Sequence, residues 1–532
     1  MTQVPSPLAS LEVYIDTPEA FVPRAAWVLE TLLAPLGRTV AVIREAARAG
    51  EAALAYAPAP VAGVPTIPCS DEAMDLFAGA RPLPAGSFAR RAPAGPGHAG
   101  IAGAAPAVVA AFPATDPAGF AAPCDLVASS FALLACWDER TASERDRYGR
   151  LPYSAGVFAA NPELRIDEPA VDRYVELLRA VLPPRLAALG LAPLPQPGWM
   201  WGDAGFAVAL THDVDNLWRW TRRGFAAAGY RTARSAYRRD WAAAGRELGD
   251  TADWLVRHLP RRTDPYWTFP QILGGEDVRG VTSTFFVIAR HTHRQDGNQP
   301  ETYRRRIPEA LTLLARHRRE IGLHGNDADR LDLDPLVDDR ARLAREARTE
   351  VHGIRYHYLR CLYHETLPLL ERAGFSYDTS LAFAEHEGFR CGCSFPFRPY
   401  SLAEERPLDL LELPLAVMDG TLQQPHYRGL PPREAERTAA AVFARVRASG
   451  GASSLLWHNS RFDPRLSRGY DEVYWNLVDG VKEHGGIAAS AGSIVARWRE
   501  ALRLPQPSSP QANGPPTRAC RVDGTADAPS TA

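Results

Sequence analysis

The sequence predicts an α/β protein in which parallel strands and crossover helices close into a barrel, preceded by a smaller α/β domain. Three observations predict this. Short apolar runs alternate with helical patterns from about residue 205 onward. A Pro/Gly-rich segment separates that half from the first 200 residues, and 532 residues exceed what one hydrophobic core usually holds. Because strand-then-helix order repeats seven or eight times, we expect a closed or nearly closed barrel.

The first 200 residues predict the smaller domain. Apolar runs such as "LEVYID" and "RTVAVI" alternate there with helical patterns such as "AAWVLETLLAPL". An Ala/Pro/Gly-rich stretch from about Arg81 to Ala122 is typical of a loop. The segment "PPRLAALGLAPLPQPGWMWGDAG" is rich in Pro and Gly, and it indicates the junction to the next domain. We therefore expect an α/β accessory domain over residues 1–200.

Residues 205–503 hold the strands expected to build the barrel. Helical patterns lie between many of them, and in such barrels the chemistry gathers at the carboxyl ends of the strands. A segment rich in Arg and aromatic residues, about 216–262, predicts a helical insertion after the first strand, and residues 504–532 predict a disordered tail. The expected strands are "FAVALTHDVD" (206–215), "VTSTFFVIA" (281–289), "EIGLHG" (320–325), "GIRYHYLR" (353–360), "SYDTSLAF" (376–383), "LLELPLAVMD" (410–419), "SSLLWHNS" (453–460) and "GIAASAG" (486–492).

Composition excludes several classes of protein. An apolar content of 46% and a charged content of 23% are those of an ordinary globular chain, and a net charge of −2 gives no reason to expect nucleic acid as a partner. No window reaches the roughly 20 apolar residues of a membrane-spanning helix. The seven cysteines are odd in number and widely spaced, so we expect free thiols. The start lacks the basic end and apolar run of a signal peptide, and we expect a cytoplasmic protein.

Polar residues end or lie on five of the expected strands. Taken singly, a histidine at a strand end is commonly structural and an aspartate there is commonly a helix cap. Together they indicate a site, because burying so many polar groups costs free energy unless a metal or a substrate satisfies them. The residues are Asp213, Asp215, His324, Arg355, His357, Asp378 and His458.

The first of these strands places two carboxylates side by side. If "ALTHDVD" is extended, Thr211, Asp213 and Asp215 face one side, while His212 and Val214 face the other. Ionising two neighbouring carboxylates costs free energy unless a cation lies nearby. With a cation present, one carboxylate can be its ligand and the other can accept protons. Carboxylate and imidazole donors together suit a divalent metal, and zinc is the expected one.

At these motifs the chain resembles the polysaccharide deacetylase, or NodB-homology, family. The resemblance covers residues 205–500, and the first 200 residues look like the extra domain of some bacterial members. It implies a distorted (β/α) barrel that removes N-acetyl groups from sugars with a divalent metal. By this resemblance Asp213 in "THDVD" is the catalytic base, Asp215 is a metal ligand, and His324 in "EIGLHG" is the first metal-binding histidine.

The same resemblance assigns the remaining polar residues. It makes Arg355 in "GIRYHY" an arginine that lines the groove. It makes His458 in "LLWHNS" the terminal histidine that donates a proton to the leaving amine, and Asp378 in "SYDTS" the aspartate that supports this acid. A carbohydrate or a sugar-linked molecule is therefore the expected substrate.

One departure from the family motif concerns the third metal ligand. Four residues after His324 the family has a second histidine, and this chain has Ala328. Either the third ligand comes from elsewhere, or the site binds metal weakly, or the protein has lost catalysis. The candidates for a replacement ligand are His357, Asp327 and His212, in that order. His357 is preferred because it shares a strand face with the groove arginine, whereas His212 should point away from the pair of aspartates.

Two alternatives to a sugar deacetylase remain open. One is a barrel without catalysis that binds carbohydrate or serves in an assembly. The other is a hydrolase of a small non-sugar amide, because the same residues can cut other C–N bonds. The expected insertion is either a solvated helix on the barrel or a surface whose arginines and aromatic rings bind sugar phosphates or an anionic membrane.

Overall fold

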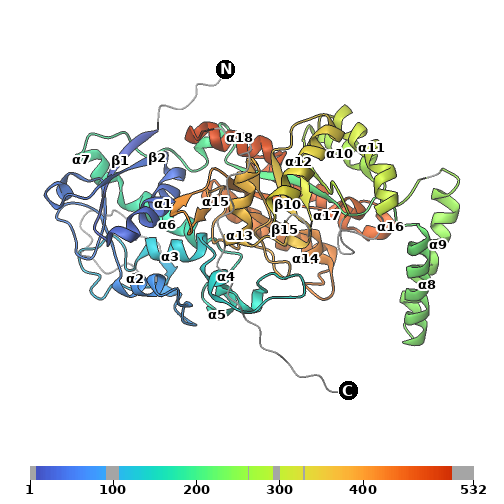
Figure 1. Cartoon of the computed structure of the whole chain (residues 1–532), viewed down its shortest axis with the longest axis horizontal. Coiled ribbons are helices and arrows are strands. Elements are labelled where there is room, and N and C mark those ends of the chain that lie inside the picture. Colours follow the sequence, from blue (N-terminus) through green and yellow to red (C-terminus); the bar gives the residue numbers. More distant parts are fainter. Residues whose placement is uncertain (1–7, 92–106, 262, 292–299, 327–329, 506–532) are drawn as a thin grey trace.

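The computed structural model describes residues 8–91, 107–261, 263–291, 300–326 and 330–505. In Figure 1 the N-terminal segments coloured blue form one end of an elongated molecule, and the barrel lies beside them. The predicted tail lies outside the described residues from residue 506 on. Among the described residues, no helix combines the length and the apolar character that crossing a lipid bilayer requires.

The N-terminal region contains a parallel sheet with the strand order β2-β1-β3-β4. α1 crosses between β1 and β2 and buries one side in the core, including Trp27 and Leu32. The predicted loop contains a short antiparallel ribbon of β5 and β6, which the Ala- and Gly-rich composition concealed. The elements are β1 (Ala9–Ile15), α1 (Val22–Leu33), β2 (Arg38–Ile43), β3 (Leu54–Ala57), β4 (Thr66–Pro68), α2 (Asp71–Ala78), β5 (Ala89–Arg91), β6 (Val108–Ala110), α3 (Leu126–Leu134), α4 (Trp137–Thr141), α5 (Val157–Ala160), α6 (Ala170–Val181) and α7 (Pro183–Ala188).

The second region is built on a curled sheet in which every pair of strands is parallel. Its order is β14-β11-β10-β9-β8-β7-β16-β15, and β17 pairs with the first half of β7. β7 is buried along its whole length, as expected of the central strand of a sheet covered on both faces. The strands are β7 (Phe206–Val214), β8 (Thr284–Val287), β9 (Glu320–Gly325), β10 (Gly353–Tyr356), β11 (Tyr377–Asp378), β14 (Leu411–Glu412), β15 (Leu415–Met418), β16 (Ala452–Leu456) and β17 (Gly486–Ala489).

The barrel closes through one interrupted strand. β14 pairs with β11 at one end of the sheet, and β15 pairs with β16 at the other end. Only Leu413 and Pro414 separate β14 from β15, so the two ends of the sheet must meet. The run "LLELPLAVMD" is thus one predicted strand that Pro414 divides, because proline has no N–H for the ladder. The predicted distorted (β/α) barrel is confirmed.

Helices connect these strands and cover the barrel. α8 and α9 form the expected insertion after β7 and project from the far end of the molecule (Figure 1). Near their turn, Tyr237 is 90% exposed and Trp241 is 69% exposed. The helices are α8 (Arg222–Tyr237), α9 (Trp241–Asp253), α10 (Phe269–Arg279), α11 (Pro300–Arg316), α12 (Leu333–Ala347), α13 (Tyr363–Arg372), α14 (Asp419–Gln423), α15 (Pro432–Ser449), α16 (Pro464–Ser467), α17 (Tyr470–Glu483) and α18 (Ala491–Leu502); two antiparallel strands, β12 (Tyr400–Ser401) and β13 (Arg406–Pro407), lie between α13 and β14.

The N-terminal region and the barrel share one hydrophobic core. The Trp27 ring of α1 lies 5.0 Å from the ring of Tyr400, and its indole N–H donates to the Arg398 carbonyl at 2.8 Å. The Ser394 N–H donates to buried Asp172 of α6 at 3.0 Å. Buried apolar side chains of both regions belong to the same continuous cluster. The Pro/Gly-rich junction in the sequence therefore does not correspond to a separation between the two regions in the structure.

We predict that Gly353→Ala destabilises the barrel. Gly353 pairs with Tyr377 of the neighbouring strand, and a Cβ at Gly353 would overlap the Tyr377 ring. That ring is restrained because its hydroxyl donates to Glu320 Oε1 at 2.9 Å. We expect the free energy of unfolding, measured by urea denaturation, to fall by about 1–3 kcal/mol.

Gly249→Ala is the matched control for this substitution. Gly249 lies in α9, where an added Cβ has no atom within 4 Å. Alanine there should leave stability unchanged or raise it by up to about 1 kcal/mol, because alanine favours a helix over glycine. Similar losses in both variants would contradict the packing argument.

Candidate active site

The predicted polar residues gather at the carboxyl end of the barrel. Asp213 lies near the end of β7, and Asp215 follows that strand. His324 lies on β9, Arg355 lies on β10, and His357 comes directly after β10. His458 follows β16. Because these strands are parallel, their carboxyl ends share one edge of the barrel, and the side chains converge there.

Asp213 is held by a buried arginine. One guanidinium nitrogen of Arg355 donates to Asp213 Oδ1 at 3.1 Å and to Thr211 Oγ1 at 2.7 Å. The other terminal nitrogen donates to Thr379 and Ser454, and Arg355 is fully buried. Arg355 therefore fixes the carboxylate of Asp213 from inside the barrel. It is not exposed to the groove that the family resemblance assigns to it.

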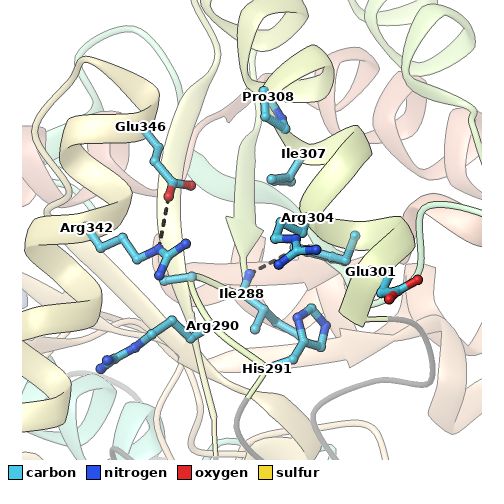
Figure 2. Close-up of a pocket in the computed structure, with 11 residues that line it drawn as sticks. Ile288, Arg290, His291, Glu301, Arg304, Ile307, Pro308, Arg342 and Glu346 are labelled. Atoms are coloured by element: carbon cyan, nitrogen blue, oxygen red, sulfur yellow. Dashed lines mark hydrogen bonds and ion pairs between the residues drawn. The ribbon is translucent and has the colours of Figure 1, made fainter.

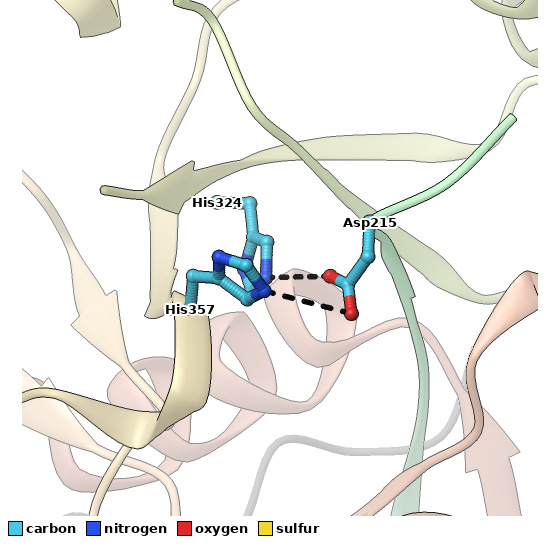
Figure 3. A group of neighbouring side chains, drawn as sticks. All are labelled: Asp215, His324 and His357. Carbon is cyan, nitrogen blue, oxygen red and sulfur yellow. Dashed lines mark hydrogen bonds and ion pairs between the residues drawn. The ribbon is translucent and has the colours of Figure 1, made fainter. Parts of the chain in front are cut away.

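Three side chains form a cluster suited to a metal ion (Figure 3). One ligand atom from each of Asp215, His324 and His357 lies within 4.8 Å of the others. His324 Nε2 is 3.1 Å from Asp215 Oδ1, and His357 Nε2 is 3.7 Å from Asp215 Oδ2. His324 Nδ1 is 2.9 Å from the Arg355 carbonyl, so this nitrogen carries the hydrogen and Nε2 is free to ligate. One carboxylate and two imidazoles fit the donor set of zinc or a similar cation.

The electrostatics of the cluster favour positive charge. Burial alone would raise the pKa of Asp215, but His357, His324 and His458 outweigh it and hold that pKa far below its ordinary value. Burial lowers the pKa of His357 to about 4, so this imidazole is neutral at pH 7. Burial also opposes charge on His324, but Asp213 and Asp215 dominate and raise its pKa. The negative charge of Asp213 and Asp215, which favours a proton on His324, would also favour a bound cation.

His458 has the geometry of a general acid, and its partner is Asp419. His458 Nδ1 lies 2.6 Å from Asp419 Oδ1, and the His458 backbone N–H donates to Asp419 Oδ2 at 3.0 Å. Its Nε2 faces the cluster, 3.5 Å from Asp215 Oδ2. Although burial opposes the charge, Asp419 and Asp215 raise the pKa of His458 to about 9. The imidazole is therefore protonated at neutral pH.

The prediction that Asp378 supports this acid is wrong. Both Asp378 carboxylate oxygens accept hydrogen bonds from Ser380, at 2.7 and 2.9 Å. Its other neighbour is the buried carboxyl group of Glu412, whose pKa is raised well above the ordinary value by burial and by Asp378. Asp378 ends β11, and the divided strand of β14 and β15 lies between β11 and β16, whose end carries His458. The sequence signal for Asp419 was its position directly after "LPLAVM", at the end of an expected strand.

The other two candidates for the third ligand are His212 and Asp327, and the structure describes only His212. His212 points to the opposite side of β7, as strand alternation predicts, with Nδ1 2.8 Å from the Trp457 carbonyl and Nε2 3.3 Å from Glu276. It does not reach the cluster. Asp327, like Ala328, lies outside the described residues.

Two hollows lie around this end of the barrel. One, of about 640 Å³, opens beside β8 between α11 and α12 (Figure 2). Two of its three arginines are engaged, Arg290 with Asp339 and Arg342 with Glu346, and none of the predicted site residues lines it. The other, of about 560 Å³, lies between the base of the α8–α9 hairpin and α14. Its largely polar lining includes Arg461, which is 3.9 Å from Asp419, so this hollow adjoins the acid pair.

Comparisons with known proteins each cover part of the chain. A sequence profile of a family described as "Family of unknown function (DUF7033)" matches residues 15–186. No curated protein sequence matches the chain. One similar solved structure is described as a polysaccharide deacetylase from Mycobacterium smegmatis, with 22% identity and a TM-score of 0.38 over 60% of this chain and 98% of that one. The PuuE allantoinase has 14% identity and a TM-score of 0.38, over 57% and 94%. A protein of Pseudomonas aeruginosa PAO1, described as a polysaccharide deacetylase, has 14% identity and a TM-score of 0.38, over 57% and 95%.

Proposed function

We propose that the chain is a metal-dependent hydrolase that removes N-acetyl groups from a carbohydrate. The observation that carries the proposal is the pairing of a base and an acid around one ligand cluster. Asp213 Oδ2 lies 3.8 Å from His324 Nε2, and His458 Nε2 lies 3.5 Å from Asp215 Oδ2. Hydrolysis of an amide needs both groups, one to accept a proton from water and one to protonate the amine that leaves.

The residues of the cluster would hold a divalent cation, and zinc suits their donor set. Asp215, His324 and His357 offer one oxygen and two nitrogens, the set typical of hydrolytic zinc sites. When bound, such a cation polarises an amide carbonyl and lowers the pKa of water. Asp213, kept in place by Arg355, is then the proton acceptor.

The leaving amine takes its proton from His458. An amine anion is too basic to leave unaided, so its nitrogen must be protonated as the C–N bond breaks. Asp419 holds the His458 ring through Nδ1, so Nε2 is the nitrogen that donates. The same contact stabilises the imidazolium before transfer.

A carbohydrate substrate is supported by the hollow beside the acid pair. Its volume of about 560 Å³ exceeds the needs of a small amide, and hydroxyl, amide and charged side chains line it. Such side chains bind sugar hydroxyls by hydrogen bonds. They include Tyr266, Gln423, Gln424, Ser460, Arg461 and Tyr470.

The test is an amine-release assay with purified, metal-loaded protein. N-acetylated amino sugars, free and nucleotide-linked, should release amine, whereas cyclic imides and ureides should not. Release from the imides or ureides alone would replace the sugar proposal with a small-amide hydrolase. If elemental analysis finds no metal in protein purified after supplementation with zinc, the barrel without catalysis becomes the better account.

We predict that Asp213→Asn lowers kcat by at least about 100-fold while metal content is unchanged. Asparagine keeps the size of the side chain and its bond to Arg355, but it cannot accept the proton. Elemental analysis and the amine-release assay measure the two quantities in the same sample. Loss of metal in this variant would show that Asp213 is a ligand rather than the base.

A further inference from the structure

The two histidines of the ligand cluster are held in different ways. His324 is oriented by the bond from its Nδ1 to the Arg355 carbonyl, as metal-binding histidines usually are. The Nδ1 atom of His357 is buried, and within the described part of the chain it has no hydrogen-bond partner. Its ring therefore lacks the usual restraint, and its orientation must come from packing.

The packing partner of His357 is the next residue. The Tyr358 ring stacks on the imidazole, with centroids 3.9 Å apart and planes at 21°. This requires unusual backbone, because Tyr358 has φ 58° and Leu359 has φ 56°. Left-handed backbone costs a residue with a Cβ about 1–2 kcal/mol, and it persists only where surrounding contacts fix it.

Those contacts come from the N-terminal region, some 200 residues earlier in the sequence. The Tyr148 ring stacks on the other face of Tyr358, with centroids 4.5 Å apart and planes at 15°. Arg150 donates to the Tyr358 carbonyl at 2.5 Å, and Arg360 donates to the Tyr148 carbonyl at 3.0 Å. The Tyr358 ring thus lies between the rings of His357 and Tyr148, and its backbone carbonyl accepts from Arg150.

The turn that presents these groups is itself rigid. Asp146 accepts from the backbone N–H groups of Tyr148 and Arg150, at 2.8 and 3.0 Å. Its other oxygen accepts from the Arg150 guanidinium at 2.6 and 2.9 Å. Arg150 is buried, so this ion pair is little screened by solvent.

We propose that the 146–150 turn of the N-terminal region positions His357 as the third metal ligand, acting through Tyr358. The inference rests on the proposed function. In this proposal the N-terminal region contributes to the metal site. It restrains the imidazole of His357, which would replace the second histidine of the family motif. Tyr148 and Arg150 are positioning residues, since neither belongs to the ligand cluster.

The test is the affinity of the full chain for zinc and cobalt(II), measured by competition with a chelator. Tyr148→Ala and Arg150→Ala should each weaken metal binding by about 10–100-fold, the usual effect of losing a group that orients a ligand. Tyr148→Phe keeps the stacking ring and should bind like the native chain. The cobalt(II) absorption spectrum should change in the alanine variants and not in Tyr148→Phe, because it reports the ligand geometry.

Arg165→Ala is the matched control. Arg165 is exposed in the same region and pairs with Asp167, so its loss should leave affinity and spectrum unchanged. Near-ultraviolet circular dichroism verifies that each variant is folded. If Arg150→Ala fails to fold, the test depends on Tyr148, which is half-buried. The metal affinities of Tyr148→Ala and Tyr148→Phe are then compared.

Native affinity and spectrum in folded Tyr148→Ala and Arg150→Ala would overturn the positioning role, whatever the activity of the enzyme. Weakened binding in these variants, with no release of amine from any N-acetyl sugar by the native chain, would uphold the positioning role and reject the proposed substrate. A native chain that binds neither zinc nor cobalt(II) would overturn both proposals.

Discussion

Asp215→Ala should lose its metal and, with it, hydrolysis. Asp215 is the carboxylate that both imidazoles of the cluster approach, at 3.1 and 3.7 Å. Its removal leaves two neutral donors, which hold a divalent cation poorly. Because a bound cation contributes several kcal/mol of transition-state stabilisation, activity should fall by at least about 1000-fold. Elemental analysis and the amine-release assay measure the two effects.

Asp203→Ala serves as the control for this variant. Asp203 is an exposed aspartate just before β7, so its loss changes the charge of the chain equally without touching the cluster. It should retain native metal content and activity. Full metal retention by Asp215→Ala would refute its assignment as a ligand, and equal retention in Asp213→Asn would then remove the proposed division of work between the two aspartates.

His458→Ala should keep its metal and lose turnover by about 100- to 10,000-fold, the range attributed to general acids. Although burial opposes the charge, Asp419 and Asp215 raise the pKa of His458 to about 9, so the imidazole is protonated at neutral pH, and alanine cannot replace it as a donor. Asp419→Asn should give a smaller loss, because the ring remains but the charge that raises its pKa is gone.

His484→Ala is the histidine control, because His484 lies exposed at the end of α17. The informative comparison is between substrates. An N-acetyl group on an amine that leaves easily should be cleaved by His458→Ala with a smaller loss than an ordinary amino sugar. Equal losses on both substrates would show that His458 acts in some way other than protonating the amine.

The sequence was sufficient to predict the barrel and most of the residues that gather at its candidate site. Strand-then-helix order is local, so each of the eight apolar runs contains at least one strand of the barrel sheet. Alternation along β7 separated His212 from Asp213 because a strand has a fixed period of two. His357 was chosen because it lies on such a run and shares a strand face with Arg355.

The pairing of acid and carboxylate could not be predicted in the same way. Asp378 lies on one expected strand and Asp419 ends another, and their local sequence does not show which of them meets His458. The choice between them depends on which strand ends beside β16, and this follows from closure of the barrel at β15. The restraint on Tyr358 was hidden for the same reason, since Tyr148 and Tyr358 are distant in sequence and meet only through the packing of two regions.

Because the N-terminal region and the barrel share one core, neither region can be removed or exchanged without exposing the other. A fragment beginning at Phe206 would lose the Trp27 ring that packs on Tyr400 and the Asp172 carboxylate that accepts from Ser394. Such a fragment would present apolar surface to water and invite aggregation. Substitutions on the two sides of this shared core must therefore compensate each other. Recombination that joins an unrelated N-terminal region to the barrel would bring together surfaces that do not match.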